Sequence, residues 1–245
     1  MLGRSAGDFV IAALDCSQQR AVELADLMAG RLVWAKVGME LFYQAGGQIV
    51  RDLKDRGLKV FLDLKLHDIP NTVRSAARVL AGLGADMLTI HASGGPDMVR
   101  AAREGLEEGA ASSGRTRPSL LAVSVLTSMD QAALASVGVE RPVADQAQML
   151  AKMACSSGAD GVVCSALEAR AMRSCLGKGA LIVTPGIRPA GAEAGDQARV
   201  VTPGLAVRNG ATHLVVGRPI TQAPDSLRAL LDIQAEVESA LSNDL

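Results

Sequence analysis

Charged side chains gather where one apolar run ends, and they are the strongest indication of chemistry in this sequence. The run Val60-Phe61-Leu62 leads directly into Asp63-Leu64-Lys65-Leu66-His67-Asp68. Side chains two positions apart in a strand point to the same face, so Asp63 and Lys65 should leave it side by side. Asp68 adds a second carboxylate just beyond. Two carboxylates around one ammonium hold that lysine protonated and suit an ionic reaction, whereas a solvated ion-pair network is the plainer alternative.

Two further charged residues follow other apolar runs. Asp15 ends the first run and Lys36 ends the second, where each alone is more typical of a cap or a solvated side chain. In a closed barrel, however, they would flank Asp63 and Lys65, so that lysine and aspartate alternate. Like charges about 4 Å apart repel by about 4 kcal/mol at an effective dielectric near 20, so alternation is the order that tolerates burial. Lys65 would then stay protonated and serve as a general acid.

A metal site formed by Asp63, His67 and His91 is an alternative interpretation of the same region. We disfavour it because neither histidine has a suitably spaced partner and Lys36 brings positive charge to the ring. The cysteines lack CxxC spacing, which predicts core side chains in a reducing compartment: Cys16, Cys155, Cys164 and Cys175. The sequence therefore predicts neither a metal nor another cofactor.

Two segments in the last quarter of the sequence have the character of an anion site. Thr184-Pro185-Gly186-Ile187-Arg188 opens a loop rich in glycine and alanine, Ala190–Asp196, which ends at Gln197. The arginine and the glutamine at its ends favour a lid that closes over a ligand rather than a plain surface excursion. After a later apolar run, Gly217 lets backbone N–H groups approach an anion and Arg218 supplies a charged fork. Phosphate sites after strands seven and eight recur in barrels.

The elements that must position these residues alternate along the whole sequence. Short β-branched runs predict strands at Val10–Leu14, Trp34–Val37, Val60–Leu64, Met87–Ile90, Leu120–Leu126, Gly161–Cys164, Leu181–Thr184 and His213–Val216. Amphipathic patterns predict helices at Arg20–Met28, Glu40–Arg56, Val73–Leu83, Met98–Glu107, Ala144–Ser156, Leu167–Cys175, the short Leu205–Asn209 and Asp225–Leu241.

This alternation predicts the α/β class. Eight strand–helix units of about 30 residues match a (β/α)8 TIM barrel forming a single domain over residues 1–245. An open, doubly wound sheet is the main competitor. Polar residues follow all eight predicted strands, however, which is typical of a barrel with one central site.

Composition narrows the classes of partner. With 245 residues, 49% hydrophobic residues and a net charge of −1, the chain resembles an ordinary globular protein. Aromatic residues make up 2% and basic residues are scattered, so we expect no nucleic-acid partner. No apolar run reaches membrane-spanning length, and the first ends at Asp15, too early for a signal peptide. We therefore expect a cytoplasmic protein with a small-molecule substrate and no membrane partner.

Together these motifs resemble orotidine 5′-phosphate decarboxylase of the bacterial type. The resemblance runs nearly end to end, through Leu14-Asp15, Lys36–Phe42, Phe61–Thr72, Leu126–Ser128, Thr184–Arg188, Asp196-Gln197 and Val216–Arg218. The pattern Asp-x-Lys-x-x-Asp is shared by several phosphosugar barrels. Its extension through Ile69-Pro70-Asn71-Thr72 and the run Thr-Pro-Gly-Ile-Arg are much narrower.

The resemblance implies cofactor-free decarboxylation of orotidine 5′-phosphate to UMP, in de novo pyrimidine biosynthesis. It implies a catalytic set in which Lys65 donates the proton, together with Asp63, Asp68 and Lys36. It implies ribose contacts from Asp15 and Lys36, a pyrimidine contact near Thr127, and a 5′-phosphate held by Arg188, Gln197, Gly217 and Arg218. Asp63 and Thr72 complete the implied substrate contacts. In the implied homodimer, Asp68 and Thr72 reach the neighbouring subunit's site, while Ala190–Gln197 closes as the lid.

Two other functions remain open at this point. Metal-dependent relatives, such as 3-keto-gulonate 6-phosphate decarboxylase and hexulose-phosphate synthase, share Asp-x-Lys-x-x-Asp but place a metal-binding carboxylate where Lys36 stands. A non-catalytic nucleotide-binding barrel would keep the pocket without turnover. The four intact charged residues argue against such a degenerate site.

Overall fold

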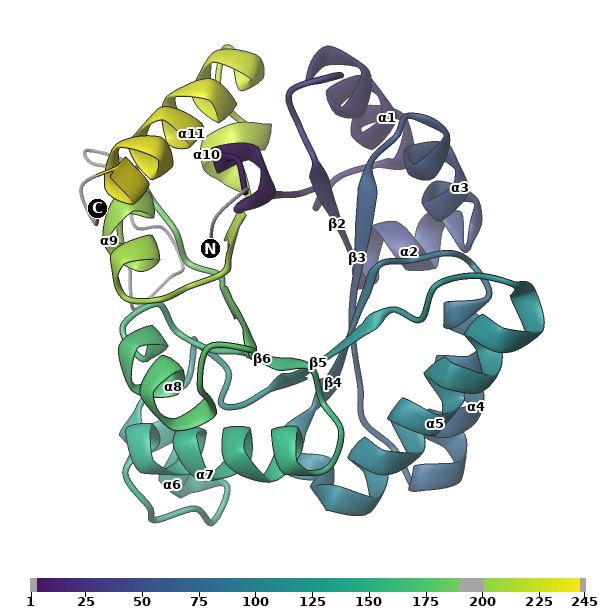
Figure 1. Cartoon of the computed structure of the whole chain (residues 1–245), viewed down its shortest axis with the longest axis vertical. Coiled ribbons are helices and arrows are strands. Elements are labelled where there is room, and N and C mark those ends of the chain that lie inside the picture. The colour runs from purple at the N-terminus through teal and green to yellow at the C-terminus, as the bar shows by residue number, and fades with distance from the viewer. Residues whose placement is uncertain (1–3, 190–200, 243–245) are drawn as a thin grey trace.

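In the computed structural model, residues 4–189 and 201–242 are described, and they form a closed barrel of parallel strands ringed by helices (Figure 1). The strands are β1 (Val10–Ala13), β2 (Trp34–Gly38), β3 (Lys59–Leu66), β4 (Met87–His91), β5 (Ser119–Val123), β6 (Gly161–Val163), β7 (Leu181–Thr184) and β8 (His213–Val216). Each strand pairs with the next in chain order, and β1 pairs with β8. The predicted (β/α)8 barrel is thereby confirmed, and the open-sheet alternative is wrong.

Helices follow the strands around the outside of the barrel. They are α1 (Gln18–Leu27), α2 (Met39–Ala45), α3 (Gln48–Asp55), α4 (Pro70–Ala81), α5 (Gly95–Ser113), α6 (Gln131–Ser136), α7 (Val143–Ser156), α8 (Ala169–Leu176), α9 (Pro203–Arg208), α10 (Arg218–Thr221) and α11 (Ser226–Ser242). Two short 3₁₀ turns, Ala6–Asp8 and Ala92–Gly94, precede β1 and α5.

The helix predicted over Glu40–Arg56 is wrong in one respect, because the structure divides it into α2 and α3. Gly46 ends α2 with a positive φ of 59°, a conformation that glycine adopts without steric cost. At Gly47 a Cβ atom would lie 2.8 Å from a methyl carbon of Leu83, so the chain passes too close there for a larger residue. The short α6 and α10 were not predicted either, since neither is long enough to show helical periodicity.

The strands bury both faces, and this arrangement decides where side chains point. Inside the barrel one cluster contains alternate residues, among them Trp34, Phe61 and Met87. The other strand face packs against the helices in a second, larger cluster. Because strand side chains alternate, Lys36 and Thr89, two positions beyond Trp34 and Met87, continue the inward-facing rows. The inner core thus gives way to polar side chains toward the C-terminal ends of the strands.

At the opposite end of the barrel, a polar side chain just before three of the four even-numbered strands ties each of them to the preceding strand. Asp86, Asp160 and Thr212 stand immediately before β4, β6 and β8. Each accepts a hydrogen bond from a backbone N–H of the preceding strand, at 2.7 Å from Val60, 2.7 Å from Leu120 and 2.9 Å from Ile182 respectively. These contacts fix the N-terminal ends of the strands in pairs.

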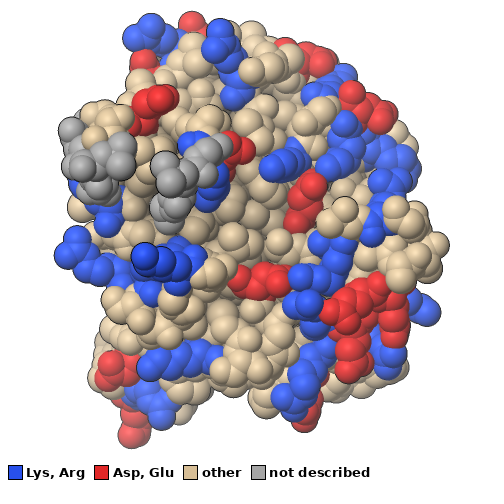
Figure 2. Space-filling model, viewed as in Figure 1, with Lys and Arg blue, Asp and Glu red and all other residues tan. Residues whose placement is uncertain are grey.

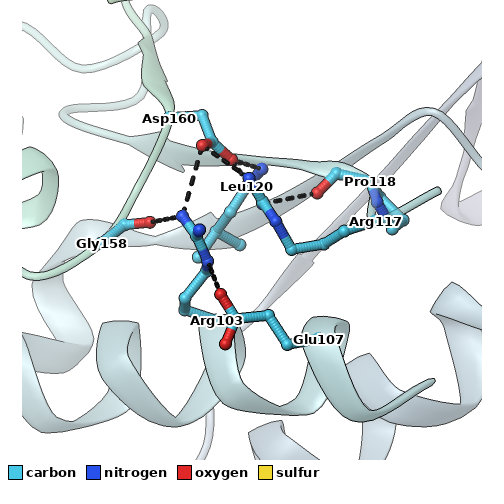
Figure 3. A network of polar contacts seen from close by, with 7 residues as sticks. All are labelled: Arg103, Glu107, Arg117, Pro118, Leu120, Gly158 and Asp160. Atoms are coloured by element: carbon cyan, nitrogen blue, oxygen red, sulfur yellow. Dashed lines mark hydrogen bonds and ion pairs between the residues drawn. The ribbon is translucent and has the colours of Figure 1, made fainter. Parts of the chain in front are cut away.

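Asp160 also gathers two arginines, as Figure 3 shows. Arg117 donates to both carboxylate oxygens, at 2.7 and 2.9 Å, and Arg103 lies 3.4 Å from one of them. Burial alone would raise the pKa of Asp160, but the hydrogen bonds from Arg117 and Leu120 and the arginine charges outweigh it and lower that pKa. The carboxylate is therefore a charged anchor for the N-terminal ends of β5 and β6.

The structure places the cysteine side chains in or against the core, as predicted. Cys164 belongs to the outer core cluster, and Cys16, Cys155 and Cys175 pack against that cluster as free thiols. On the face shown in Figure 2, lysine and arginine side chains are interspersed with aspartate and glutamate. No helix within the described ranges is both long and apolar enough to cross a bilayer.

Candidate active site

A pocket of about 410 Å³ opens at the C-terminal ends of β1, β2, β3, β7 and β8. This is the end at which barrels carry their chemistry. Seven of the residues predicted from the sequence line it: Asp15, Lys36, Asp63, Lys65, Arg188, Gly217 and Arg218.

Along one side of the pocket, lysine and aspartate alternate as predicted. Lys36 Nζ lies 2.8 Å from Asp15 Oδ1 and 3.8 Å from Asp63 Oδ2. Lys65 Nζ lies 2.8 Å from the same Asp63 oxygen. The side chains of Lys36 and Asp63 are 8% and 14% exposed, so their charges interact through little water. We call Asp15, Lys36, Asp63 and Lys65 the charge array.

The backbone beneath the array departs from a regular strand. Leu62 pairs with Leu88 and Leu66 with Ile90, so β3 carries three residues where β4 has one. Within this bulge Lys65 has a φ of 51°, and it is the one non-glycine residue with positive φ in the described chain. Asp63 and Lys65 are therefore brought together as predicted, but by a bulge rather than by the simple alternation of a strand.

A glycine makes room for the array on β2. A Cβ atom at Gly38 would lie 2.8 Å from Asp15 Oδ1 and 2.8 Å from Lys36 Nζ. Any larger residue would push these two side-chain ends apart, although it would meet no backbone atom at that distance. Gly38 thus leaves the space that Asp15 and Lys36 occupy in their present positions.

The other side of the pocket has two arginines. Arg188 follows β7, is 7% exposed, and donates from Nη1 to the carbonyl of Ile187 at 2.9 Å. Burial, and then the positive charge of Arg218 from the start of α10, lower the pKa of Arg188. Two cations that disfavour each other in this way are stabilised by an anion between them.

Gly217 stands between β8 and Arg218 and lines the same pocket. A Cβ at Gly217 would come no nearer to its neighbours than 3.7 Å from Ala13 Cβ. The protein itself therefore leaves space above the Gly217 backbone, and a ligand atom could approach there.

Three predicted residues lie outside the described lining of this pocket. Asp68 and Thr72 are exposed on the loop after β3 and in the first turn of α4, and Asp68 accepts a hydrogen bond from the N–H of Ile69. Thr127 is half-buried in the turn after β5. Gln197 and the rest of the predicted lid Ala190–Gln197 lie outside the residues that the structure describes.

The two histidines near the array lie together, with ring centroids 5.3 Å apart. Burial lowers the pKa of His91, and the charges of His67 and Lys65 lower it further. In the part of the chain that is described, no group of three His, Cys, Asp or Glu side chains could hold a metal ion.

Several residues of the site were not found from the sequence. Met39, Glu40, Thr221 and Gln222 line the pocket because α2 and α10 begin at its rim. Thr89 lies beneath the array and contacts Asp63 and Lys65. The sequence places it only within the predicted strand Met87–Ile90, and no local pattern marks it, because its role depends on the register between β3 and β4.

Comparisons with known proteins agree over nearly the whole chain. Residues 8–233 match the family described as Orotidine 5'-phosphate decarboxylase / HUMPS. The chain is 50% identical over 240 residues to the orotidine 5′-phosphate decarboxylase of Moorella thermoacetica. The aligned region covers 97% of this chain and 95% of that protein. It is 48% identical over 236 residues to the Sodalis glossinidius protein of the same name, with 96% and 92% covered. A crystal structure of orotidine 5′-phosphate decarboxylase from Lactobacillus acidophilus superposes with a TM-score of 0.83 at 42% identity, covering 94% of this chain and 99% of that one.

Proposed function

The chain belongs to the Orotidine 5'-phosphate decarboxylase / HUMPS family, and from this we propose that it converts orotidine 5′-phosphate to UMP, with Lys65 delivering the proton. The relatives named orotidine 5′-phosphate decarboxylase, at about 50% identity, assign the reaction and its place in pyrimidine biosynthesis. The observation that carries the residue roles is the charge array, in which Lys65 stands next to Asp63 at the mouth of a pocket.

The reaction has a specific electrostatic demand. Loss of carbon dioxide from C6 of the pyrimidine leaves a carbanion with no adjacent electron sink. An ammonium already in place stabilises that charge as it develops and needs no reorganisation at the moment of reaction. Lys65, held at 2.8 Å by Asp63, is such a group, and it then transfers its proton to C6 as a general acid.

The other members of the array set the charge around Lys65. Asp63 pairs with Lys65 at 2.8 Å and holds its ammonium at the wall of the pocket. Lys36, between Asp15 and Asp63, offsets the two carboxylates, so the substrate's own carboxylate does not meet an uncompensated cluster of negative charge. We assign the ribose contacts to Asp15 and Lys36, which stand at the pocket wall, and the pyrimidine contact to the neighbourhood of Thr127.

The arginine side of the pocket suits the 5′-phosphate. Arg188 and Arg218 supply charge-assisted donors, and Gly217 lets backbone N–H groups approach. We extend this group to Gln197, with Ala190–Gln197 as a lid, by resemblance. Binding energy gained at the phosphate, away from the bond that breaks, lowers the barrier when it helps to close the site.

The metal-dependent members of the family fit this site less well. They place a metal-binding carboxylate at the position of Lys36, which here is an ammonium 8% exposed between two carboxylates. Lys36 would repel a metal ion at this position. The two lysines and two aspartates of the charge array already balance one another's charge without a metal ion.

We further propose that the protein acts as a homodimer. The N-cap residue Ile69 and Val79 of α4 are exposed, at 67% and 64%, and Thr72 lies on the same side by helical spacing. Asp68 stands at the start of this surface and outside its own subunit's pocket. Docking a second copy there would bury the apolar side chains and bring Asp68 and Thr72 to the neighbouring site. We also place the protein in the cytoplasm, in keeping with four thiols that form no disulfide.

The direct test is the loss of ultraviolet absorbance of orotidine 5′-phosphate with purified protein in excess EDTA. We expect steady conversion to UMP that is insensitive to the chelator. Folded protein that gave no conversion, with or without added Mg²⁺, would contradict the function. Conversion that stopped in EDTA and returned with Mg²⁺ would contradict the metal-free mechanism.

A further inference from the structure

The bulge in β3 puts a strained backbone under the most important side chain of the site. A residue with a Cβ in the left-handed region costs about 1–2 kcal/mol, and such a conformation persists where its surroundings hold it. Lys65 has this conformation, with a φ of 51°. Lys65 lies where the β3–β4 pairing is interrupted, between Leu62 and Leu66, so the part of β4 opposite this interruption faces the strained residue.

Thr89 is the residue of β4 opposite the bulge. Its neighbours Leu88 and Ile90 pair with Leu62 and Leu66, so Thr89 alone faces the three residues between them. Its side chain is fully buried. The Thr89 hydroxyl accepts a hydrogen bond from the backbone N–H of Lys65 at 2.9 Å and donates one to Asp63 Oδ1 at 3.0 Å.

The second of these contacts gives each oxygen of the Asp63 carboxylate a partner. Oδ2 of Asp63 faces the two lysines, at 2.8 Å from Lys65 and 3.8 Å from Lys36. Oδ1 takes the hydroxyl of Thr89. The carboxylate is therefore fixed in rotation, and one hydroxyl ties the side chain of Asp63 to the backbone of Lys65.

We propose that Thr89 is a positioning residue for the decarboxylation, one that holds the bulge and thereby the relative placement of Asp63 and Lys65. Thr89 acts through these two residues and is absent from the described lining of the pocket. This inference rests on the proposed function for its kinetic readout. Thr89 contacts Asp63 and Lys65 at the reacting end of the site, so the effect of changing it can be distinguished from an effect on phosphate binding.

The test compares Thr89→Val, which keeps the shape and removes the hydroxyl, with Thr89→Ser, which keeps the hydroxyl. A matched control is Thr212→Val, because Thr212 is also buried and its hydroxyl also bonds a neighbouring strand, at the Ile182 N–H and carbonyl, but at the other end of the barrel. Thermal denaturation of all three variants reports the structural cost.

For Thr89→Val we expect kcat to fall about 10- to 100-fold while KM changes less than about threefold, because the reacting groups shift and the phosphate contacts do not. Thr89→Ser and Thr212→Val should keep kcat within about threefold of the parent, even where Thr212→Val melts lower. A parental kcat in Thr89→Val, an equal loss in Thr89→Ser, or an equal loss in Thr212→Val would overturn the role.

Amide hydrogen exchange at Lys65 separates this inference from the function itself. If the parent protein does not turn over orotidine 5′-phosphate, the proposed function fails and exchange alone decides the role of Thr89. We expect the Lys65 amide to exchange at least about tenfold faster in Thr89→Val than in the parent or Thr89→Ser. Equal exchange in all three would overturn the inference, whatever the activity.

Discussion

At the scale of single residues, the reacting end of the site depends on three neighbouring side chains, Asp63, Lys65 and Thr89. Asp63 and Lys65 were predicted from their spacing, and the structure places them 2.8 Å apart. Their contact depends, however, on a bulge and on Thr89, which no local pattern announces because a bulge is set by the register between two strands. Charged residues are visible in a sequence as soon as they interrupt an apolar run. A buried hydroxyl inside such a run is not.

Lys65 gives the sharpest prediction at this scale. Lys65→Ala should lower turnover by about 10³-fold or more, because it removes both the ammonium that stabilises the carbanion and the proton donor. Lys54→Ala is a matched control, since Lys54 pairs with Asp86 at the same 2.8 Å at the opposite end of the barrel. Steady-state kinetics on folded protein would measure both. Near-parental turnover in Lys65→Ala would exclude it as the donor.

Arg218 tests the other side of the pocket. Arg218→Ala should weaken UMP binding by about 2 kcal/mol, because a charge-assisted donor to the phosphate is lost. Uridine, which lacks the phosphate, should lose much less. Calorimetric titration of both ligands gives the comparison. Equal losses would show that Arg218 does not recognise the phosphate.

At the scale of elements, strand positions were largely predictable and helix boundaries less so. All eight predicted strands overlap the observed ones, because buried parallel strands appear as short β-branched runs between polar turns. The interruption between α2 and α3 was missed, since Gly46 and Gly47 sit within a pattern that otherwise continues. The contact that requires Gly47, with Leu83, comes from a segment far along the chain.

Asp160 supplies a prediction that concerns how strands are held. Asp160→Asn should lower the free energy of unfolding by about 2 kcal/mol at pH 7, because charge-assisted hydrogen bonds to Arg117 and Leu120 weaken. The pKa of Asp160 is lowered in the folded protein, so its stabilisation is complete above the unfolded value near 4 and is lost as pH falls through the folded value. Urea denaturation at pH 7 and pH 3 should therefore show a difference that shrinks on acidification. A difference independent of pH would contradict this role, and turnover should stay parental at pH 7.

At the scale of the whole molecule, the chemistry and the anchoring contacts occupy opposite ends of one barrel. The pocket lies at the C-terminal ends of the strands, whereas Asp86, Asp160 and Thr212 act at the N-terminal ends. The polar residues that follow the predicted strands indicated the pocket end of the barrel from the sequence alone. The sequence did not reveal the other end, because an aspartate before a strand resembles any loop residue until the neighbouring strand is known.

A mixing experiment tests the proposed dimer at this scale. Lys65→Ala and Asp68→Ala should each be nearly inactive. If Asp68 completes the neighbour's site, subunits exchanged at random should recover about a quarter of parental activity, since half of the dimers are mixed and each contains one intact site. Mixing after unfolding and refolding together, with either variant alone as control, measures this. No recovery despite mixed dimers would place Asp68 in its own subunit's site or outside catalysis.

The lack of space for a side chain at Gly38 predicts the effect of mutations at its codon. Every other amino acid has a Cβ atom, and a Cβ here would crowd the ends of Asp15 and Lys36, which can move aside without disturbing the backbone. Missense mutations at this codon should therefore yield a protein that accumulates normally and fails in its task. Such alleles would escape a screen for expression and would be detected only by an assay of decarboxylase activity.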